Sequence, residues 1–405
     1  MQYAVVILDG ASGEAVEEFG GQTSLEASET PYLDALARGG LVGLAQNVPQ
    51  GMVSGSDVAC LSIMGYDPEL FSIGRGAIEA AALGIELVPG QVALRMNLCT
   101  VEAGIMRSYS AGNISDCDGK ALANELKARL DDETFTLYPG ISFRQVLLVS
   151  GLPEVSRLEY GLPHDFAGLD VSDRFLPKAL GEQAPEQQAA QRLAEYLFAA
   201  NEILVKSPTN KRRVAEGKLP ANCTWLLWPG KKPETLLPFE ELYGKRAAVN
   251  SAVDLLVGLA KLANMGIYRF EGVTDGPTND FSAQGLGALQ MLEDGNDLVF
   301  IHVEAPDAAG HDGDFAEKKR AIEQSDRFIL GPLLEYAKTH PLRIAVLPDH
   351  PTPIATRRHA NEPVPFVVAG PGIAHNGVSR MTELSAASTG LFLEHGHRLI
   401  ADLLL

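Results

Sequence analysis

The feature that most constrains this fold is a set of apolar runs that end at carboxylates. Residues 4–8 end at Asp9, and residues 343–347 are followed, after a proline, by Asp349 and His350. Uninterrupted apolar runs of this length are typical of strands buried on both faces of a parallel sheet. A buried strand has no structural need to end on a carboxylate and an imidazole, because both are costly to dehydrate without a partner.

A third apolar run, residues 298–303, leads to Asp307 and His311. Because these two residues are four apart, one helical turn would place both on one face, within reach of a single cation. Residues 315–338 then read as a helix that crosses back to the strand at 343, completing a right-handed βαβ unit. Parallel strands end at one edge of a sheet, where open α/β folds place their chemistry. The acidic and imidazole groups are therefore predicted to gather there.

Ser56 is the candidate nucleophile for this edge. Gly55 allows a tight loop, and the apolar residues after Ser56 indicate the start of a helix. A hydroxyl at a helix N-terminus is well placed for an alkoxide or a phosphoryl group. The alternative that Ser56 only caps the helix stays open, as does a capping role for Asp9. Ser54 and Ser62 are weaker candidates, because neither follows a glycine.

These side chains form one set of hard ligands once His359, in a proline-rich loop, is added. Three carboxylates, three imidazoles and a hydroxyl at one edge require cations, and two divalent ions divide the set. A serine beside such an ion is activated for attack on phosphorus, since the cation stabilises its alkoxide. The residues therefore predict phosphoryl transfer through a phosphoserine.

Charge and composition narrow the class of partner. The chain has 405 residues, a formal net charge of −19 and 46% hydrophobic residues, as in an ordinary globular protein. The negative charge argues against nucleic acid and anionic membranes. An anionic substrate would need local Arg and Lys residues, or metal. Four scattered cysteines without a Cys-x-x-Cys pair suit the cytoplasm, and no run approaches the ~20 apolar residues of a membrane span.

An inserted domain is predicted at residues 86–221, within a discontinuous α/β domain of residues 1–85 and 222–405. The outer domain is expected to hold a mostly parallel sheet flanked by helices, and the insertion to be α+β. Shorter strands and two helices mark the change of texture, at residues 91–101, 141–150, 115–130 and 186–204.

Several groups suited to an anion lie in or beside this insertion. Arg144 stands in an apolar strand, His164 and Asp165 follow a proline, and residues 210–213 form a basic run. Arg75 lies between two glycines, but the third position of a dinucleotide fingerprint is Glu79, so a Rossmann site is excluded. For each group a solvated surface remains the alternative.

The motifs together resemble the alkaline phosphatase superfamily, and specifically the archaeal-type cofactor-independent phosphoglycerate mutases, closest to their bacterial branch. The resemblance covers nearly the whole chain. Its motifs are Asp9-Gly10, Gly55-Ser56-Asp57, Asp307-x-x-x-His311, Pro348-Asp349-His350 and His359, with Gly65 to Pro68, Tyr109 to Gly112, Pro163 to Asp165, Asn210 to Asn222 and Ala252 to Leu256.

The resemblance implies interconversion of 3-phosphoglycerate and 2-phosphoglycerate without 2,3-bisphosphoglycerate, in glycolysis and gluconeogenesis. It implies two divalent ions, usually manganese or magnesium, with zinc as a further possibility. Ser56 would take and return the phosphoryl group. One ion would be held by Asp307, His311 and His359, and the other by Asp9, Ser56, Asp349 and His350.

The insertion would hold the glycerate while it reorients, with Asp165 as a candidate acid or base. The candidate substrate contacts are Arg75, Arg144, His164, Asn210, Arg213 and Lys245. Where many archaeal members have an Arg-Gly-x-Gly run after Ala-Asn, this chain has Cys223-Thr-Trp-Leu-Leu-Trp228-Pro-Gly230, which resembles a bacterial branch sometimes proposed to phosphorylate homoserine. A phosphotransferase on another small metabolite, or a phosphatase, therefore stays open. A non-catalytic protein would be expected to lack a ligand, and none is missing. The oligomeric state is left open.

Overall fold

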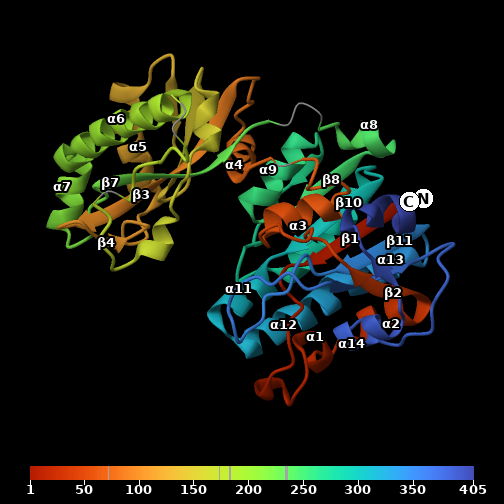
Figure 1. The fold of residues 1–405 in the computed structure, drawn as a ribbon. Helices are drawn as coiled ribbons and strands as arrows, with labels where there is room; N and C mark the ends of the chain where they lie inside the picture. Colours follow the sequence, from red (N-terminus) through yellow and green to blue (C-terminus); the bar gives the residue numbers. More distant parts are fainter. Residues whose placement is uncertain (72, 173, 182–183, 233–235) are drawn as a thin grey trace. The chain divides into compact units, whose positions relative to one another are not determined.

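The computed structural model describes the whole chain except residues 72, 173, 182–183 and 233–235. The chain divides into two compact units (Figure 1). Unit 1 comprises residues 1–72 and 235–405, and unit 2 comprises residues 73–234. The insertion is therefore 13 residues longer at each end than the predicted 86–221.

Two elements account for the wider insertion. Helix α4 (Arg75–Ala82) packs against strands β3 (Gln91–Glu102) and β7 (Cys223–Gly230) of unit 2. The sequence placed β7 in the outer domain, but β7 pairs antiparallel with β3. A Cβ at Gly76 would lie 2.2 Å from the Ala93 carbonyl oxygen, so the glycine allows α4 to approach the sheet closely.

Unit 1 is built on an eight-stranded sheet in the order β13-β2-β12-β11-β1-β10-β8-β9. All neighbouring pairs are parallel except the two that involve β12, so the mostly parallel sheet is confirmed. The strands are β1 (Gln2–Leu8), β2 (Gly40–Ala45), β8 (Ala247–Asn250), β9 (Gly266–Tyr268), β10 (Leu298–Val303), β11 (Leu342–Leu347), β12 (Val364–Ala369) and β13 (Phe392–Leu393).

The register of the three central strands brings their carboxyl ends together. Leu8 pairs with Val303 of β10, and Ile7 pairs with Leu347 of β11. All three strands are buried, apart from the intermediate Gln2 and Arg343. The sheet edge predicted to collect the functional groups is therefore present.

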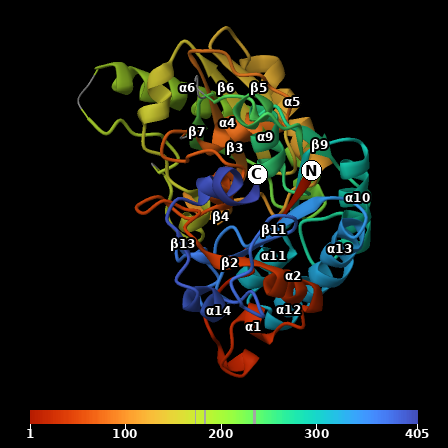
Figure 2. The ribbon, with the colours of Figure 1, turned by 90° about the vertical axis from the view of Figure 1, so that its right-hand side faces the viewer.

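Helices cover the sheet of unit 1 on both faces (Figures 1 and 2). The predicted helix 315–338 is interrupted by a π-helical segment, Asp326–Leu330, which ends next to Gly331-Pro332; proline cannot donate a helical hydrogen bond. The helices are α1 (Ser24–Ala27), α2 (Pro31–Gly39), α3 (Ser56–Ile63), α8 (Phe239–Tyr243), α9 (Asp254–Leu262), α10 (Phe281–Glu293), α11 (Ala305–Asp312), α12 (Phe315–Ser325), α13 (Gly331–Ala337) and α14 (Glu383–Ser388).

Unit 2 is an antiparallel sheet, as expected of an α+β insertion. Helices α5 and α6 share a core with its strands. Its elements, besides α4, β3 and β7, are β4 (Ile105–Ser108), α5 (Asp116–Leu130), β5 (Phe135–Tyr138), β6 (Arg144–Ser150), a 3₁₀ turn (Pro163–Phe166), α6 (Ala184–Lys206) and α7 (Pro208–Ala215).

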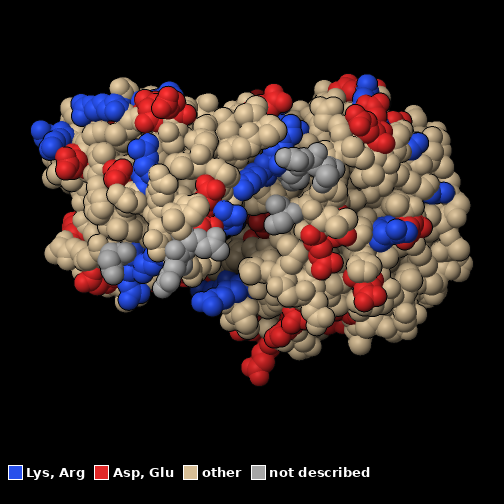
Figure 3. Space-filling model, turned by 45° about the horizontal axis from the view of Figure 1, so that its top comes forward, with Lys and Arg blue, Asp and Glu red and all other residues tan. Residues whose placement is uncertain are grey.

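The surface carries both signs of charge. On the face drawn in Figure 3, small groups of basic side chains are interspersed with acidic ones. Among the described residues, no helix combines the length and the apolar character needed to cross a membrane.

Candidate active site

Asp307, His311 and His359 form the first group at the carboxyl edge, named here the Asp307 group. Helix α11 presents Asp307 and His311 one turn apart, as predicted, and the loop after β11 supplies His359. His311 Nε2 lies 3.1 Å from Asp307 Oδ2 and 2.8 Å from His359 Nε2. One atom from each residue lies within 4.8 Å of the others, so the three could hold one metal ion.

The Asp9 group comprises Asp9, Asp349 and His350, all fully buried at the ends of β1 and β11. His350 Nε2 lies 3.3 Å from Asp349 Oδ2 and 3.8 Å from Asp9 Oδ1. These residues also satisfy the geometry of a metal site. The structure therefore brings the predicted ligands together in two groups, both within unit 1.

Ser56 joins the Asp9 group from the start of α3. Its Oγ lies 3.3 Å from His350 Nε2. Gly55 is the N-cap, in an extended conformation, and Ser56 is the first helical residue. The alternative that Ser56 serves only as the cap is therefore wrong. The hydroxyl stands where the helix dipole favours negative charge.

The two groups are directly connected. The rings of His350 and His359 stack with their centroids 3.9 Å apart. Thr352, which the sequence reasoning missed, donates a hydrogen bond to Asp307 Oδ1 and lies 3.3 Å from His350 Nδ1. Gly10 has a φ of +59° and a Cβ there would lie 2.4 Å from Asp307 Oδ1, so only glycine lets the chain pass between the groups.

Desolvation and neighbouring negative charges raise the pKa values of Asp9 and Glu304. Burial, followed by the negative charges of Asp349 and Glu304, holds the pKa of Asp9 well above its usual range. Burial likewise raises the pKa of Glu304 to about 8, and lowers the pKa of the buried His302 to about 4. The sequence reasoning missed Glu304 and His302, although a histidine inside the apolar run 298–303 was a signal.

In the Asp307 group, by contrast, the pKa of the carboxylate is lowered. Burial alone would raise the pKa of Asp307, but hydrogen bonds with His311 and His359 outweigh it and hold the pKa well below its usual range. The same hydrogen bond to Asp307 raises the pKa of His311 to about 9. The Asp307 carboxylate therefore stabilises the protonated forms of His311 and His359.

The donor set fits divalent cations. Asp9 Oδ1 is buried and has no hydrogen-bond partner, which is costly unless a cation meets it. A bound cation would also reduce the repulsion between the neighbouring carboxylates and lower their raised pKa values. Carboxylate oxygens and imidazole nitrogens suit manganese, magnesium and zinc to different degrees.

Some of the predicted substrate contacts lie on the surface of unit 2. Arg144 is the first residue of β6 and is exposed, contrary to the apolar environment expected for it. His164 and Asp165 lie in the 3₁₀ turn, also exposed, with His164 Nε2 3.7 Å from Asp165 Oδ1. Arg75 is the first residue of α4, and its guanidinium carbon lies 4.2 Å from the centroid of the Trp228 ring.

Three other candidates are placed where substrate contact is not favoured. The Asn210 amide donates to the Leu204 and Ala221 carbonyls in the interior of unit 2. Arg213 is buried, and its guanidinium donates hydrogen bonds to Asp118 and to backbone carbonyls. Lys245 precedes β8, at the amino edge of the sheet, opposite the functional groups. The sequence could not anticipate these surroundings, because polarity alone does not show which partner a side chain meets.

Arg95 is a basic residue that the sequence reasoning missed. It is almost buried in β3, where it forms a two-point ion pair with Glu79, and its guanidinium carbon lies 4.8 Å from the Trp228 ring. Burial, together with the charges of Arg75 and Arg144, lowers the pKa of Arg95 to about 10 despite the ion pair. The Trp228 ring is therefore flanked by two arginines, Arg75 and Arg95.

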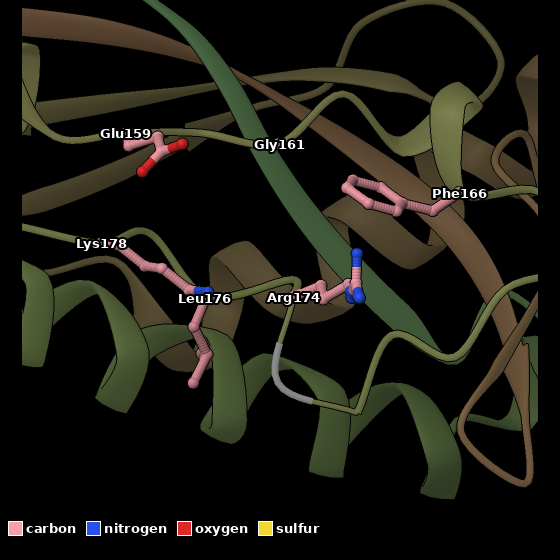
Figure 4. A pocket seen from close by; sticks show the side chains of 6 residues that line it. All are labelled: Glu159, Gly161, Phe166, Arg174, Leu176 and Lys178. Carbon is pink, nitrogen blue, oxygen red and sulfur yellow. The ribbon is translucent and has the colours of Figure 1, made fainter.

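Unit 2 also contains a surface cavity of about 400 Å³ (Figure 4). The Arg174 guanidinium lies 5.5 Å from the ring of Phe166, which packs on Trp225. None of the predicted substrate contacts lines this cavity. The lining residues are Glu159, Gly161, Phe166, Arg174, Leu176 and Lys178.

Comparisons with known proteins identify the family. The family model described as 2,3-bisphosphoglycerate-independent phosphoglycerate mutase matches residues 37–210. A curated relative of that name from Methanosarcina barkeri is 41% identical over 370 residues, covering 91% of this chain and 90% of the relative. A probable mutase from Geobacter sulfurreducens is 38% identical over 414 residues, covering 100% of both chains.

Two solved structures have the same fold as this chain. A Pyrococcus horikoshii protein superposes with a TM-score of 0.84 at 29% identity, covering 99% of this chain and 95% of that one. The cofactor-independent phosphoglycerate mutase from Thermoplasma acidophilum superposes with a TM-score of 0.66 at 26% identity, covering 100% and 99%. The chain is therefore an enzyme of the 2,3-bisphosphoglycerate-independent phosphoglycerate mutase family.

Proposed function

We propose that this enzyme interconverts 3-phosphoglycerate and 2-phosphoglycerate through a phosphoserine at Ser56. The observation that carries the proposal is the position of Ser56 Oγ, 3.3 Å from His350 Nε2 and at the start of α3, beside two groups of residues that could each hold a metal ion. Curated relatives with near-complete coverage bear the name of this activity.

The two groups supply the places for two divalent cations, manganese or magnesium. The Asp307 group would hold one ion, and the Asp9 group with Ser56 would hold the other. Bound ions would stabilise the alkoxide of Ser56 and the charge on the transferring phosphoryl oxygens. The residues of the chain fix the ligand geometry, and the N-terminus of α3 adds its own stabilisation of negative charge.

Two displacements complete the reaction. Ser56 gives up its hydroxyl proton and its Oγ attacks the substrate phosphorus, so the Oγ–P bond forms while the bond from phosphorus to the glycerate oxygen breaks, and that oxygen takes up a proton. The other glycerate hydroxyl then loses its proton, attacks the phosphoserine and releases Ser56. Asp165, on the surface of unit 2, is the proposed acid or base.

Glycerate must stay bound between these steps, and unit 2 offers exposed cationic groups for its carboxylate. Arg75 and Arg144 are the proposed contacts, with His164. Among the described contacts, Arg144 has no ion-pair partner, and Arg75 has only a 3.5 Å approach to Glu79. Both guanidinium groups therefore keep donors for an anion.

The test is a mutase assay with Mn²⁺ and either phosphoglycerate, in the absence of 2,3-bisphosphoglycerate. The wild type should interconvert the two, and Ser56→Ala should lose activity by at least ~10³-fold, as expected for loss of a nucleophile. Ser62→Ala, which alters a buried serine of the same helix, is the matched control and should retain activity.

Other outcomes identify the alternatives. Ser56-dependent phosphorylation of homoserine with ATP, without mutase turnover, would identify a phosphotransferase. Release of inorganic phosphate alone would identify a phosphatase. Full mutase activity of Ser56→Ala would contradict the phosphoserine route.

A further inference from the structure

His302 is a buried imidazole that the proposed reaction does not use. It lies in β10, and only 1% of its surface is exposed. Its Nε2 is 2.7 Å from Asp9 Oδ2, and its Nδ1 is 3.0 Å from Ser251 Oγ. Both nitrogens therefore have partners, one of which is a residue of the Asp9 group.

The hydrogen bonds around Ser251 indicate where the imidazole carries its proton. Ser251 Oγ accepts a hydrogen bond from the backbone N–H of Val253, at 3.0 Å, and its own O–H remains to be donated to Nδ1. Nε2 then carries the hydrogen and donates it to Asp9 Oδ2. An ionised Asp9, as a metal ligand, favours the same tautomer, since a carboxylate only accepts.

This contact divides the two oxygens of Asp9 between two tasks. Oδ2 is held by His302, whereas Oδ1 is buried, has no hydrogen-bond partner and lies 3.8 Å from His350 Nε2. We propose that His302 is a positioning residue, whose Nε2–H fixes the Asp9 carboxylate so that Oδ1 faces the cation of the Asp9 group. The proposal rests on the metal binding in the proposed function.

The backbone of His302 is fixed as well. The side chain of Gln284, buried in α10, donates to the His302 carbonyl at 2.7 Å and to Asn250 Oδ1 at 3.1 Å. Asn250 in turn donates to the Tyr268 carbonyl, at 3.0 Å. A fixed backbone and two hydrogen bonds leave the ring little freedom, as a positioning role requires.

A third cation between Asp9, His302 and Glu304 is the competing interpretation, because these residues also lie close enough to share an ion. Coordination by His302 Nε2 would break its 2.7 Å hydrogen bond to Asp9. Its Nδ1 already faces Ser251 on the other side of the ring. The geometry therefore favours a hydrogen-bond donor over a ligand.

The test uses two substitutions that each preserve one half of the ring. In His302→Gln the amide nitrogen reaches the place of Nε2 and can donate to Asp9, whereas in His302→Asn it reaches only the place of Nδ1. Calorimetric titration of the metal-free proteins with Mn²⁺ measures the affinity of each ion. His302→Asn should lower the affinity for one of the two Mn²⁺ ions by about 10–100-fold. The affinities of His302→Gln should stay within a few fold of those of the wild type.

Phe300→Leu is the matched control, since it disturbs a buried side chain of the same strand two residues away. It should lower the free energy of unfolding and leave both Mn²⁺ affinities unchanged. Unchanged affinities in His302→Asn, or equal losses in the Gln and Asn variants, would overturn the positioning role. The positioning role would also be overturned if the wild type bound three Mn²⁺ ions and both His302 variants bound only two.

The same titration separates this inference from the proposed function. Two bound ions with the expected difference between Asn and Gln support the positioning role even if the mutase assay shows no turnover. A wild type that turns over phosphoglycerate but binds Mn²⁺ independently of His302 supports the function and overturns the inference. Absence of Mn²⁺ binding to the wild type overturns both.

Discussion

At the scale of single residues, the site contains carboxylates whose ionised forms are disfavoured unless a cation binds beside them. The buried Asp9 and the half-buried Glu304 lie among other carboxylates, and desolvation together with these charges raises their pKa values. Asp9, Asp349 and His350 could be singled out from the sequence because they follow buried strands, and Asp307 and His311 because they lie one helical turn apart. His359 lies in a loop, where no such pattern marks it. Arg144, Asn210 and Lys245 show the limit, since their exposure, partners and sheet edge are set by the tertiary structure.

Glu304 makes the stability of the metal-free protein depend on pH. Its pKa is raised from 4.5 to about 8 in the folded state. Between those values the unfolded chain has released this proton and the folded protein retains it, so the free energy of unfolding falls as pH rises. Glu304→Gln removes this contribution. Over pH ~5 to ~8, urea unfolding of the metal-free wild type should lose stability more steeply than that of the variant.

Other titrating groups of the site are present in both proteins and largely cancel in the comparison. Saturating Mn²⁺ should flatten the wild-type profile, because a cation stabilises the ionised carboxylates. Parallel profiles for the metal-free wild type and Glu304→Gln would contradict the assignment.

Arg144 is the surface residue through which the substrate proposal can be tested. Arg144→Gln should raise KM for phosphoglycerate about tenfold, since a hydrogen bond to a charged group contributes roughly 1.5–3 kcal/mol. Mn²⁺ affinity should not change, because Arg144 belongs to unit 2 and the ligand groups to unit 1. Arg107→Gln, at an exposed arginine paired with Glu102, is the control. Equal KM values for both variants and the wild type would remove Arg144 from the substrate contacts.

At the scale of elements, regular periodicity was the reliable guide. Strands β1, β10 and β11 and helix α5 occur close to their predicted bounds, since each has a clear apolar pattern or a cap. The strands β9 and β13, which are short and lie at the sheet edges, were not predicted, because such strands carry weak patterns. The antiparallel β12 was not predicted either, and its Pro365 is atypical of a strand in the interior of a sheet. The π-helical interruption at Asp326–Leu330 depends on hydrogen-bond alignment that an apolar pattern does not encode.

The contact of α4 with its sheet is testable through Gly76. A Cβ at this position would lie 2.2 Å from the Ala93 carbonyl oxygen and 2.5 Å from that of Trp228. Gly76→Ala should therefore push α4 away and lower the free energy of unfolding by roughly 1–3 kcal/mol, measured by chemical denaturation. Gly181→Ala in the same unit, where a Cβ meets nothing within 4 Å, should have little effect. Equal stabilities of the two variants would contradict the packing argument.

At the scale of the whole molecule, the candidate metal ligands and the proposed substrate contacts belong to different units. Every predicted metal ligand and Ser56 lie in unit 1, whereas Arg75, Arg144, His164 and Asp165 lie in unit 2. The split arrangement could be predicted from the change in strand texture. Its boundaries could not, because β7 looks like any buried strand until its antiparallel pairing with β3 is known.

In the proposed reaction, Ser56 carries the phosphoryl group between the two positions of glycerate. The direct measurement is peptide mass spectrometry of the Mn²⁺-loaded enzyme, quenched in acid during turnover of 3-phosphoglycerate. A phosphate on Ser56 that is absent without substrate, and absent from Ser56→Ala, is the predicted result. A wild type that turns over the substrate with no phosphate on Ser56 at any quench time would contradict the account.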